Sequence, residues 1–280
     1  MGRALIMFSV CLYFLGCQSF PDPPVSFLSG LRVLGVRADP PQVAIGEGGI
    51  VKVLTVDTTG EMAAASWSRC LRAPLAGDAV NPDCVTQPSA AFLQPIGDGL
   101  SVTTTMPADA PAAAGQPDAT GGVYSPLVAR VTDPTDTVLA VYRWRLRTDD
   151  STPANANPSI ASLYALDASG APSPLDEATP PVVQAGDVLT LGVTFAPGSA
   201  ETYSSAGAAP ATEVLTTSWF GTAGVFSVER TSDAQPHTVL RLDQRLESAA
   251  QSPTGLIDLY AVAHDERGGT DFIHRALQLK

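Results

Sequence analysis

Three carboxylates gather in one short, glycine-containing segment near the C-terminus, at Asp265, Glu266 and Asp271. Calcium binds six or more oxygens in proteins, so these side chains and nearby backbone carbonyls could form a weak extracellular calcium site. Their spacing departs from that of an EF-hand loop, and Gly268-Gly269 supplies the positive φ angles that a tight hairpin turn requires. We therefore expect a solvated turn with Arg267 paired locally and no metal, and calcium binding is the less favoured alternative.

The histidines offer little for acid–base catalysis. His237, His264 and His274 all lie after residue 236, so the first half of the chain lacks the commonest general base. His264, His274, Asp265 and a serine could be combined into a triad, but serine and aspartate are common enough for chance to supply such a set. We expect His264 to end a strand on its solvent side. Motifs such as G-x-S-x-G, the P-loop and H-E-x-x-H do not occur, so the sequence predicts a protein that is not an enzyme and has no cofactor.

Two of the four cysteines form a natural pair. Cys11 and Cys17 lie at the N-terminus, whereas Cys70 and Cys84 lie close together in the body of the chain. In an exported protein, oxidising conditions favour a disulfide between such a pair. A metal site is a poor alternative because thiolate ligands usually occur in CxxC spacing or beside histidines, and no histidine precedes His237. We expect a local disulfide that closes one long loop and stabilises the fold by about 3 kcal/mol.

The N-terminus has the proportions of an export signal. A basic residue precedes an apolar run, Ala4–Leu15, which is too short to span the roughly 30 Å hydrocarbon core of a membrane as a helix. The following Gly16-Cys17 resembles the lipobox of bacterial lipoproteins, although Phe14 stands where that family usually has leucine. The resemblance implies a signal peptide at residues 1–16, cleavage after Gly16 and diacylglycerol on the Cys17 sulfur. An ordinary secretory signal with an incidental thiol is the alternative.

A polar, proline-containing stretch follows Cys17 and predicts a flexible tether over residues 17–30. Lipid chains contribute about 0.8 kcal/mol per buried methylene, which accumulates into stable anchoring over several chains. We therefore expect an exported protein that is lipid-anchored in the bacterial cell envelope, at the outer membrane, with the anchor as its membrane contact.

The composition limits the classes of partner. The chain has 280 residues and a formal net charge of −12, from 28 acidic and 16 basic side chains. Nucleic acids require clustered lysine and arginine, so the acidic balance argues against nucleic-acid binding. Hydrophobic residues make up 45% of the chain, which is enough for a core, and 24 glycines and 24 prolines favour many turns and few long helices.

An internal repeat divides the chain. Pro40–Glu47 (PPQVAIGE) recurs as Pro180–Asp187 (PPVVQAGD), and each copy is followed by a β-rich run and then by a tryptophan, Trp67 or Trp219. Each copy ends with an apolar strand, an Asp-containing turn and a closing strand. The order of elements is the same in both halves, so the sequence predicts two copies of one β domain.

Strict alternation of residue types identifies the strands. In the stretch from 138 to 147, one face is apolar and carries Val138, Ala140, Tyr142, Trp144 and Leu146. The other face carries three arginines, Arg143, Arg145 and Arg147, which could bind an acidic glycan or a carboxylate-bearing partner. A solvated face on an edge strand, where charge blocks aggregation, is the favoured interpretation.

These patterns predict an all-β protein built from antiparallel β-sandwiches. We place the first sandwich at residues 31–148 and the second at 180–280. A linker rich in proline, alanine and serine joins them over residues 149–179, within which 159–166 could add a short strand.

The chain resembles envelope lipoproteins of GC-rich Gram-negative bacteria. The resemblance rests on the lipobox-like Cys17, on Trp67 with Cys70, and on the segments 31–41, 155–158 and 265–269. It implies two tandem immunoglobulin-like (PKD-like) β-sandwich domains that are exported and tethered to a membrane, and it supplies no catalytic residues.

The expected function is that of a non-enzymatic, membrane-anchored envelope lipoprotein that acts as a spacer or as an adhesion or protein-interaction module. Its partner would be an envelope protein or a glycan, bound by loops or strand edges. A carbohydrate-binding accessory lipoprotein is the alternative, and it requires an exposed aromatic platform, for which Tyr124 and Tyr203 are the best candidates. Burial of Trp67, Trp144 and Trp219 favours the first hypothesis, and a solvent-facing row of these tryptophans favours the second.

Overall fold

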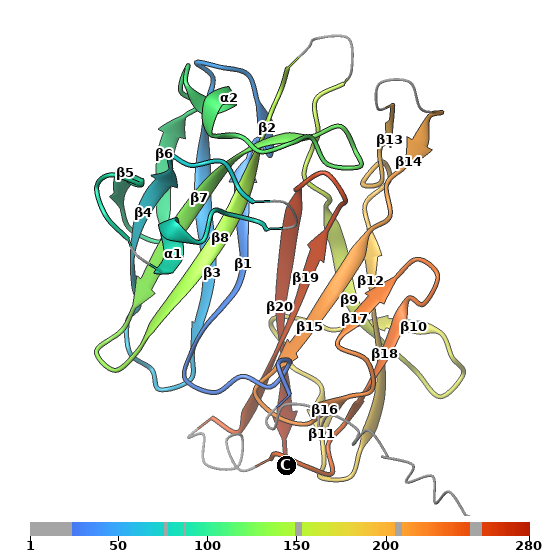
Figure 1. Cartoon of the computed structure of the whole chain (residues 1–280). Helices are drawn as coiled ribbons and strands as arrows, with labels where there is room; N and C mark the ends of the chain where they lie inside the picture. The colour runs from blue at the N-terminus through green and yellow to red at the C-terminus, as the bar shows by residue number, and fades with distance from the viewer. Residues whose placement is uncertain (1–23, 76–77, 87, 149–152, 205–208, 247–253) are drawn as a thin grey trace, which may run out of the picture.

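Alternating apolar and polar residues form strands throughout this protein, and the strands assemble into two β-sandwiches that lie side by side (Figure 1). The computed structural model describes residues 24–75, 78–86, 88–148, 153–204, 209–246 and 254–280. The predicted signal peptide and Cys17 lie outside the described residues. Within the described ranges, no helix has the length and apolar character needed to cross a membrane.

The first sandwich contains the strands β1 (Leu31–Asp39), β2 (Gln42–Val43), β3 (Gly48–Asp57), β4 (Ala64–Cys70), β5 (Leu93–Asp98), β6 (Ser101–Thr105), β7 (Val123–Thr132) and β8 (Thr137–Leu146). One sheet has the order β1-β3-β6 and the other the order β2-β8-β7-β4-β5. All pairings are antiparallel except that of β2 with β8. The connecting loops contain two single-turn helices, α1 (Asp83–Thr86) and α2 (Ala110–Ala113).

The second sandwich contains the strands β9 (Ile160–Leu166), β10 (Pro172–Pro174), β11 (Val182–Val183), β12 (Val188–Phe195), β15 (Thr216–Gly221), β16 (Val225–Phe226), β17 (Arg230–Ser232), β18 (His237–Arg241), β19 (Leu256–His264) and β20 (Thr270–Leu279). Its sheets have the orders β10-β9-β12-β18-β16 and β11-β20-β19-β15-β17. A small hairpin, β13 (Thr202–Tyr203) with β14 (Ala211–Thr212), stands beside them.

Both sandwiches have the immunoglobulin-like arrangement, in which the first, second and fifth strands form one sheet and the third, sixth and seventh form the other. In each copy a two-residue strand, β2 or β11, belongs to the second sheet and pairs parallel with the last strand, β8 or β20. A tryptophan on the third strand fills each core: Trp67 on β4 and Trp219 on β15 are each 1% exposed. The prediction of an all-β fold with two tandem immunoglobulin-like antiparallel β-sandwiches is confirmed.

The repeated segments adopt one local conformation in both sandwiches. Gly46 and Gly186 have φ angles of 82° and 93°, a region that favours glycine. The acidic residue that follows, Glu47 or Asp187, accepts a hydrogen bond of 2.8 Å from the backbone N–H three residues earlier. The spacing of glycine and acid in the two copies therefore reflects one turn that sends the chain into the second main strand.

The predicted linker over residues 149–179 is too long. β9 and β10 fall inside it, and β9 pairs with β12 from Ile160↔Phe195 to Ala165↔Leu191. Leu163 in β9 is fully buried in the second core. β9 is the short strand expected within 159–166, so that part of the prediction is confirmed. Pro172 and Pro174 lie in β10 at the sheet edge, where proline is tolerated, and composition alone therefore misplaced the boundary.

The predicted tether over residues 17–30 is also corrected where it is described. Leu28 N–H donates to Gly221 O at 2.9 Å, and Gly221 N–H donates to Ser26 O at 3.0 Å. Ser26 Oγ donates to Glu229 Oε1 at 2.8 Å. Leu28 is 1% exposed, so its apolar side chain fixes this segment against β15 of the second sandwich.

Candidate functional site

Residues 155–158 form part of the connection between the sandwiches and have no regular secondary structure. Asn157 Nδ2 donates to Ala38 O on β1 at 2.8 Å, and Asn157 Oδ1 accepts from Thr270 N–H on β20 at 2.9 Å. One carboxamide therefore joins a strand of the first sandwich to a strand of the second. An amide suits this position because it donates and accepts at the same time.

Charged and phenolic side chains reinforce the same junction. Arg37 on β1 hydrogen-bonds to Asp271 on β20, and both side chains are about four-fifths buried, at 22% and 19% exposed. The other oxygen of Asp271 accepts from Ile160 N–H at 2.8 Å. Tyr142 OH donates to Gly268 O at 3.0 Å. Partly buried pairs of this kind are screened less by salt than surface pairs, so they strengthen the contact between the sandwiches.

An apolar cluster fills the rest of the junction. Leu28, Leu34 and Val262 are buried at its centre, and half-buried aromatic and aliphatic side chains from both sandwiches surround them. Gly35 permits this contact, because a Cβ atom there would lie 3.1 Å from Val262 Cγ1. Close packing and directed hydrogen bonds therefore both join the two sandwiches at this junction.

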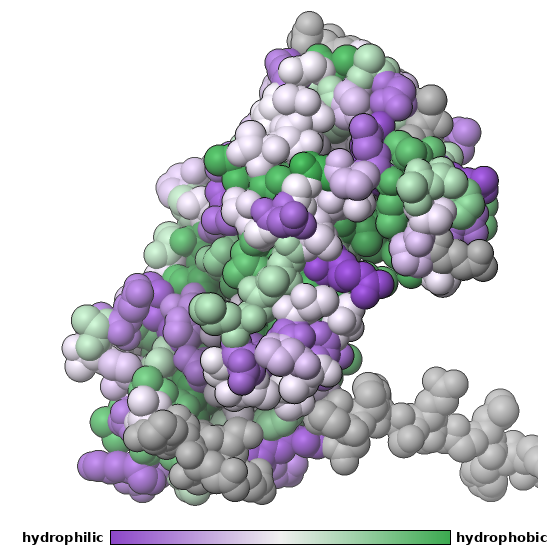
Figure 2. All heavy atoms as spheres, turned by 90° about the vertical axis from the view of Figure 1, so that its left-hand side faces the viewer, coloured by the Kyte–Doolittle hydropathy of each residue, from purple (hydrophilic) through white to green (hydrophobic). Residues whose placement is uncertain are grey.

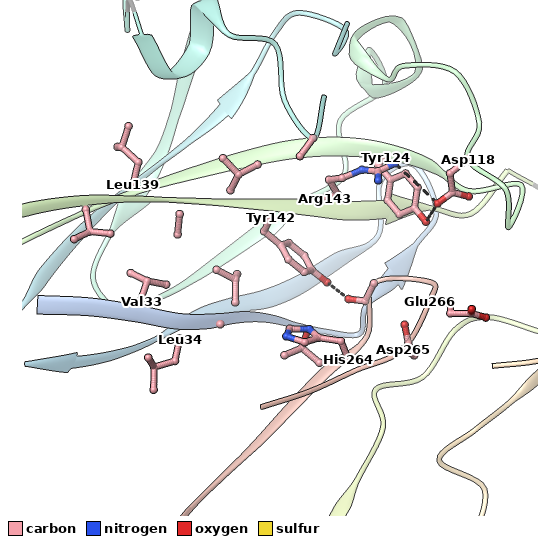
Figure 3. Close-up of a pocket in the computed structure, with 18 residues that line it drawn as sticks. Val33, Leu34, Asp118, Tyr124, Leu139, Tyr142, Arg143, His264, Asp265 and Glu266 are labelled. Atoms are coloured by element: carbon pink, nitrogen blue, oxygen red, sulfur yellow. Dashed lines mark hydrogen bonds and ion pairs between the residues drawn. The ribbon is translucent and has the colours of Figure 1, made fainter. Parts of the chain in front are cut away.

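A groove of about 480 Å³ opens beside this junction, between β1, β8 and the turn that joins β19 to β20 (Figure 3). Its floor is apolar and includes Val33, Leu34, Val36, Leu139 and Val141. Polar side chains stand at its rims: Asp118, Tyr124 and Arg143 on one side, and His264, Asp265 and Glu266 on the other. An apolar floor with a few polar groups at the rim is the usual composition of a binding site.

The first rim is held together by Asp118. Its carboxylate accepts from Tyr124 OH at 2.6 Å and from the backbone N–H groups of Thr120 and Gly122 at 2.9 Å each. Burial raises the pKa of Asp118, but these hydrogen bonds outweigh it and leave the pKa below its usual 3.8. Burial, with the nearby Asp118, raises the pKa of Tyr124. The Arg143 guanidinium lies 4.0 Å from the centre of the Tyr124 ring.

The arginine row is not a solvated face throughout. Arg145 is only 7% exposed, and its guanidinium donates to Thr120 Oγ1 at 2.7 Å and to Tyr124 OH at 2.9 Å. Arg147 donates to Glu47 at 2.7 Å. The solvated interpretation is therefore wrong for Arg145, because the loop at 118–122 folds over the strand.

Figure 2 shows hydrophilic residues scattered in small groups over the face that it presents, with apolar residues gathered across its middle.

His264 ends β19 as expected, but it lies at the second rim of the groove and not on the solvent side, so that part of the expectation is wrong. Its Nδ1 lies 3.2 Å from Thr270 Oγ1. Burial, with Arg230 nearby, lowers the pKa of His264 below its usual 6.5. His274 Nε2 instead lies 2.7 Å from Asp258 Oδ1. The structure therefore does not bring the two histidines together with Asp265 as a triad.

The three carboxylates of the candidate calcium site turn to three different partners. Asp265 Oδ1 accepts from the backbone N–H groups of the following turn at 2.7 and 2.8 Å. Asp271 pairs with Arg37, and the exposed Glu266 lies 3.4 Å from the hydroxyl of Tyr203. Within the described part of the chain, no three His, Cys, Asp or Glu side chains converge in a way that could hold a metal ion. The arrangement is a hydrogen-bonded hairpin turn.

Arg267 is the residue whose role the sequence did not reveal. It is 2% exposed, and its guanidinium donates to Glu213 Oε1 and to Glu201 Oε2 at 2.6 Å each. The expected local pairing is therefore wrong: the partners lie 54 and 66 residues away. This cluster ties the β13–β14 hairpin to the turn that forms the second rim.

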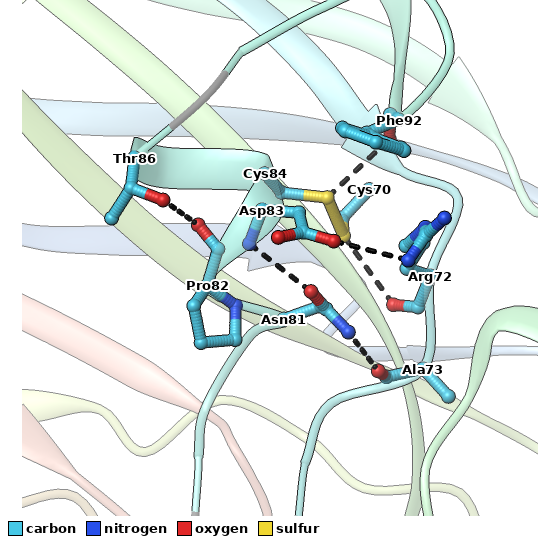
Figure 4. The surroundings of a disulfide bond; sticks show 9 residues. All are labelled: Cys70, Arg72, Ala73, Asn81, Pro82, Asp83, Cys84, Thr86 and Phe92. Carbon is cyan, nitrogen blue, oxygen red and sulfur yellow. Dashed lines mark hydrogen bonds and ion pairs between the residues drawn. A yellow bond between two sulfur atoms is a disulfide. The ribbon is translucent and has the colours of Figure 1, made fainter.

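The predicted disulfide between Cys70 and Cys84 is present (Figure 4). Cys70 ends β4 and Cys84 lies in α1, and their Cα atoms are 5.8 Å apart. Asn81 supports the bridge, because its Nδ2 donates to Ala73 O at 2.8 Å and its Oδ1 accepts from Asp83 N–H at 3.1 Å. The disulfide holds the loop after β4 against the outer face of the sheet, where both cysteines are buried beside Val80 and Val128.

The aromatic residues proposed for a sugar-binding platform do not form one in the described part of the chain. Trp67, Trp144 and Trp219 are each 1% exposed, and each indole N–H donates to an oxygen within its own sandwich, at 2.9, 3.1 and 2.9 Å. Tyr124 is 6% exposed, with its ring beneath Arg143. Tyr203 is half-buried, and its ring centre lies 5.1 Å from the Arg267 guanidinium.

Comparison with known proteins adds the following. No protein-family model and no curated protein matches this chain. Among solved structures it is similar to the three N-terminal domains of the highly immunogenic outer capsid protein (Hoc) of bacteriophage RB49, at 9% identity over 90% of this chain and 70% of that chain, with a TM-score of 0.24. It is also similar to the adhesin InvE of Yersinia pseudotuberculosis, at 10% identity over 87% of this chain and 58% of that chain, with a TM-score of 0.22. This chain thus spans less than two thirds of the adhesin structure, and at these scores the function has to be argued from the site.

Proposed function

We propose that this protein is a non-enzymatic, membrane-anchored envelope lipoprotein that acts as a protein-interaction module. In this proposal Cys17 carries the lipid, and the two sandwiches present the groove to a partner protein of the cell envelope, at the outer membrane. The apolar floor would contact the partner, and Arg143 and Glu266 at opposite rims would set its orientation by charge.

The observation that carries the proposal is the hydrogen-bonded junction between the sandwiches. Asn157 and the pair Arg37–Asp271 join the two sandwiches at the place where the groove forms. A module that served only as a flexible spacer would have no use for such a junction, whereas a binding groove that both sandwiches line requires it. Preorganisation of this kind lowers the entropy cost of binding.

The proposal also orients the molecule. Residues 26–28 lie against β15, and the seven residue-to-residue steps from Cys17 to Pro24 could span at most about 25 Å in a fully extended chain. A lipid on Cys17 would therefore hold the second sandwich near the membrane and place the first sandwich farther out. The burial of all three tryptophans supports this interaction module over the carbohydrate-binding alternative.

The groove is tested by comparing Leu139→Arg with Val188→Arg. Leu139 is 39% exposed in the groove, and Val188 is 61% exposed at the start of β12, outside it. With the purified protein as bait in envelope extracts, we expect Leu139→Arg to lose a protein partner that the wild type and Val188→Arg retain. A glycan array is screened in parallel, and binding to a defined sugar with no protein partner would refute the proposal. Cys17→Ser should move the protein to the soluble fraction, and unchanged membrane retention would refute the anchor.

A further inference from the structure

One sheet of the first sandwich ends in an open edge. In the sheet β1-β3-β6, no strand of the described residues pairs with the outer side of β6. At either end of β6, the Leu100 carbonyl accepts from β3 and the Met106 N–H donates to the residue before β3, both at 2.9 Å. In an antiparallel strand, the backbone N–H and C=O groups of successive residues point to opposite sides. Leu100 and Met106 point toward β3, so the backbone groups of Ser101, Thr103 and Thr105 point toward the open edge.

The second sandwich covers the equivalent edge with its own chain. The backbone N–H of the repeated glycine donates a hydrogen bond of 2.8 Å in each copy, from Gly46 to Met106 O and from Gly186 to Leu242 O. Met106 therefore corresponds to Leu242, and three residues earlier Thr103 corresponds to Val239. Val239 O accepts from Ser227 N–H at 2.8 Å, and Val239 N–H donates to Ser227 Oγ at 2.9 Å. Ser227 directly follows β16, which pairs antiparallel with β18. The edge of β6 is thus where a strand lies in the other copy.

A cleft of about 370 Å³ lies beside the open edge, between β5 and β6. All three threonines of β6 line it, and its floor reaches Trp144 and Leu127 of the opposite sheet. In the second sandwich, the side chain of Phe226 on β16 enters the core at the corresponding edge, with its ring 6.3 Å from that of Trp219. The cleft therefore corresponds to space that a strand residue fills in the second copy.

The floor of the cleft differs in chemistry between the copies. The two copies can be aligned on the third-strand tryptophan and its partner alanine, which are Trp67↔Ala129 and Trp219↔Ala261. In this alignment Arg69 corresponds to Gly221, and Ser125 corresponds to Ile257. Gly221 leaves space for an aromatic ring, because a Cβ atom there would lie 3.4 Å from Phe226 Cε2. The first sandwich therefore has polar residues where the second has apolar contact.

The polar residues of the cleft, Arg69 and Ser125, favour an uncharged side chain on any strand that binds beside β6. Arg69 is 5% exposed, and Asp109 already neutralises it through two hydrogen bonds of 2.9 and 3.0 Å. An additional charge would find no further compensating group among the described residues that line the cleft. Ser125 is 1% exposed, and its Oγ has no hydrogen-bond partner among the described residues. A hydroxyl or carboxamide could satisfy this atom because each can both donate and accept.

We propose that β6 binds an extended, uncharged segment of a partner protein as an added antiparallel strand, with a hydroxyl or carboxamide side chain directed at Ser125. Residues 101–105 (SVTTT) contain no charge or proline of the kind that blocks such pairing at other sheet edges. Main-chain hydrogen bonds supply the affinity and the cleft supplies the specificity. This surface is separate from the groove, so it goes beyond the proposed function and does not depend on it.

The test uses peptides taken from the chain's own covering strand. One capped peptide copies Gly224–Val228 (GVFSV), and a second carries Phe226→Gln. In NMR titrations of the full chain, we expect both peptides to shift the amide signals of β6 and the Gln peptide to bind about threefold more tightly, as one added hydrogen bond would give. The absence of shifts in β6 at millimolar peptide, or equal affinity of the two peptides, would overturn the proposal.

Three variants locate the contact. Thr103→Pro removes an outward N–H without touching the bonds to β3, and it should weaken binding about fivefold or more. Thr103→Val keeps the N–H and should bind like the wild type. Ser125→Ala should retain peptide binding but lose the preference for Gln over Phe. Equal binding by Thr103→Pro and Thr103→Val, or a preserved preference in Ser125→Ala, would contradict the inference.

Discussion

Arg267 Nε lies 2.6 Å from Glu213 Oε1, and the two side chains are 3% and 0% exposed. Glu201 is the second acceptor of the same guanidinium, at 2.6 Å. A buried pair of this kind contributes little net stability compared with apolar residues, but removal of one partner leaves an uncompensated charge in the interior. The cluster therefore determines where the β13–β14 hairpin lies beside the groove.

We predict that Arg267→Ala lowers the free energy of unfolding by about 3–5 kcal/mol, measured by chemical denaturation. The matched control is Arg241→Ala, whose pair with Asp243 is 60% and 40% exposed and should be worth about 1 kcal/mol or less. The double variant Arg267→Met with Glu213→Leu should recover much of the loss, because it leaves neither charge unpaired. Equal effects of the two single variants would contradict this account.

The disulfide should stabilise the fold mainly by restricting the unfolded chain. Cys70 and Cys84 are 14 residues apart, so their replacement by alanine should cost about 3 kcal/mol. Reduction of the wild-type protein should give the same loss, and the double variant should not respond to the reductant. Peptide mapping without reduction should recover the two cysteines linked, and free thiols at both positions would disprove the bridge.

The junction should hold one angle between the sandwiches in solution. Spin labels at Met62→Cys and Val188→Cys, which are 90% and 61% exposed in different sandwiches, should give a narrow distance distribution. Asn157→Ala removes the hydrogen bonds to both sandwiches and should broaden it. Thr194→Ala removes an exposed hydrogen bond of 2.6 Å to Ser162 inside the second sandwich and should leave the distribution unchanged. A broad distribution in the parent protein would show that the junction opens.

His264 should make stability depend on pH. Burial lowers its pKa in the folded protein below the 6.5 of an unfolded chain. As pH falls through 6.5, the unfolded state takes up the proton first, so stability decreases from 6.5 down to the lowered pKa and is fully present above 6.5. Denaturation curves at several pH values should show this slope, and His264→Gln should remove it. His274→Gln, at a half-exposed ring, serves as the control, and an equal change of slope in both variants would contradict the assignment.

The fold was predictable because its signals are local. Alternation along β8 and the tryptophan in each third strand report burial within a few residues of chain. The glycine and acidic residue of the repeated segments specify a turn from two positions alone. Such features depend on a few neighbouring residues and not on the rest of the molecule, so they can be recognised in the sequence.

The site was less predictable because its contacts are distant. Arg37 and Asp271 are 234 residues apart, and neither residue type reveals that the two meet in a junction. Arg145 lies on the polar side of an alternating strand, yet the loop at 118–122 covers it. The segment 155–158 gave no local sign of its role, because holding the two sandwiches together depends on where Ala38 and Thr270 lie.

The attachment of residues 26–28 to β15 has a mechanical consequence. Tension between the N-terminus and the first sandwich runs through residues 24–30 directly into β1, so the second sandwich is not a link in that covalent path. The second sandwich instead contacts this segment laterally, through hydrogen bonds to Ser26 and Leu28. A load on the first sandwich would therefore first detach this segment from β15 and would reach the core of the second sandwich only through the junction.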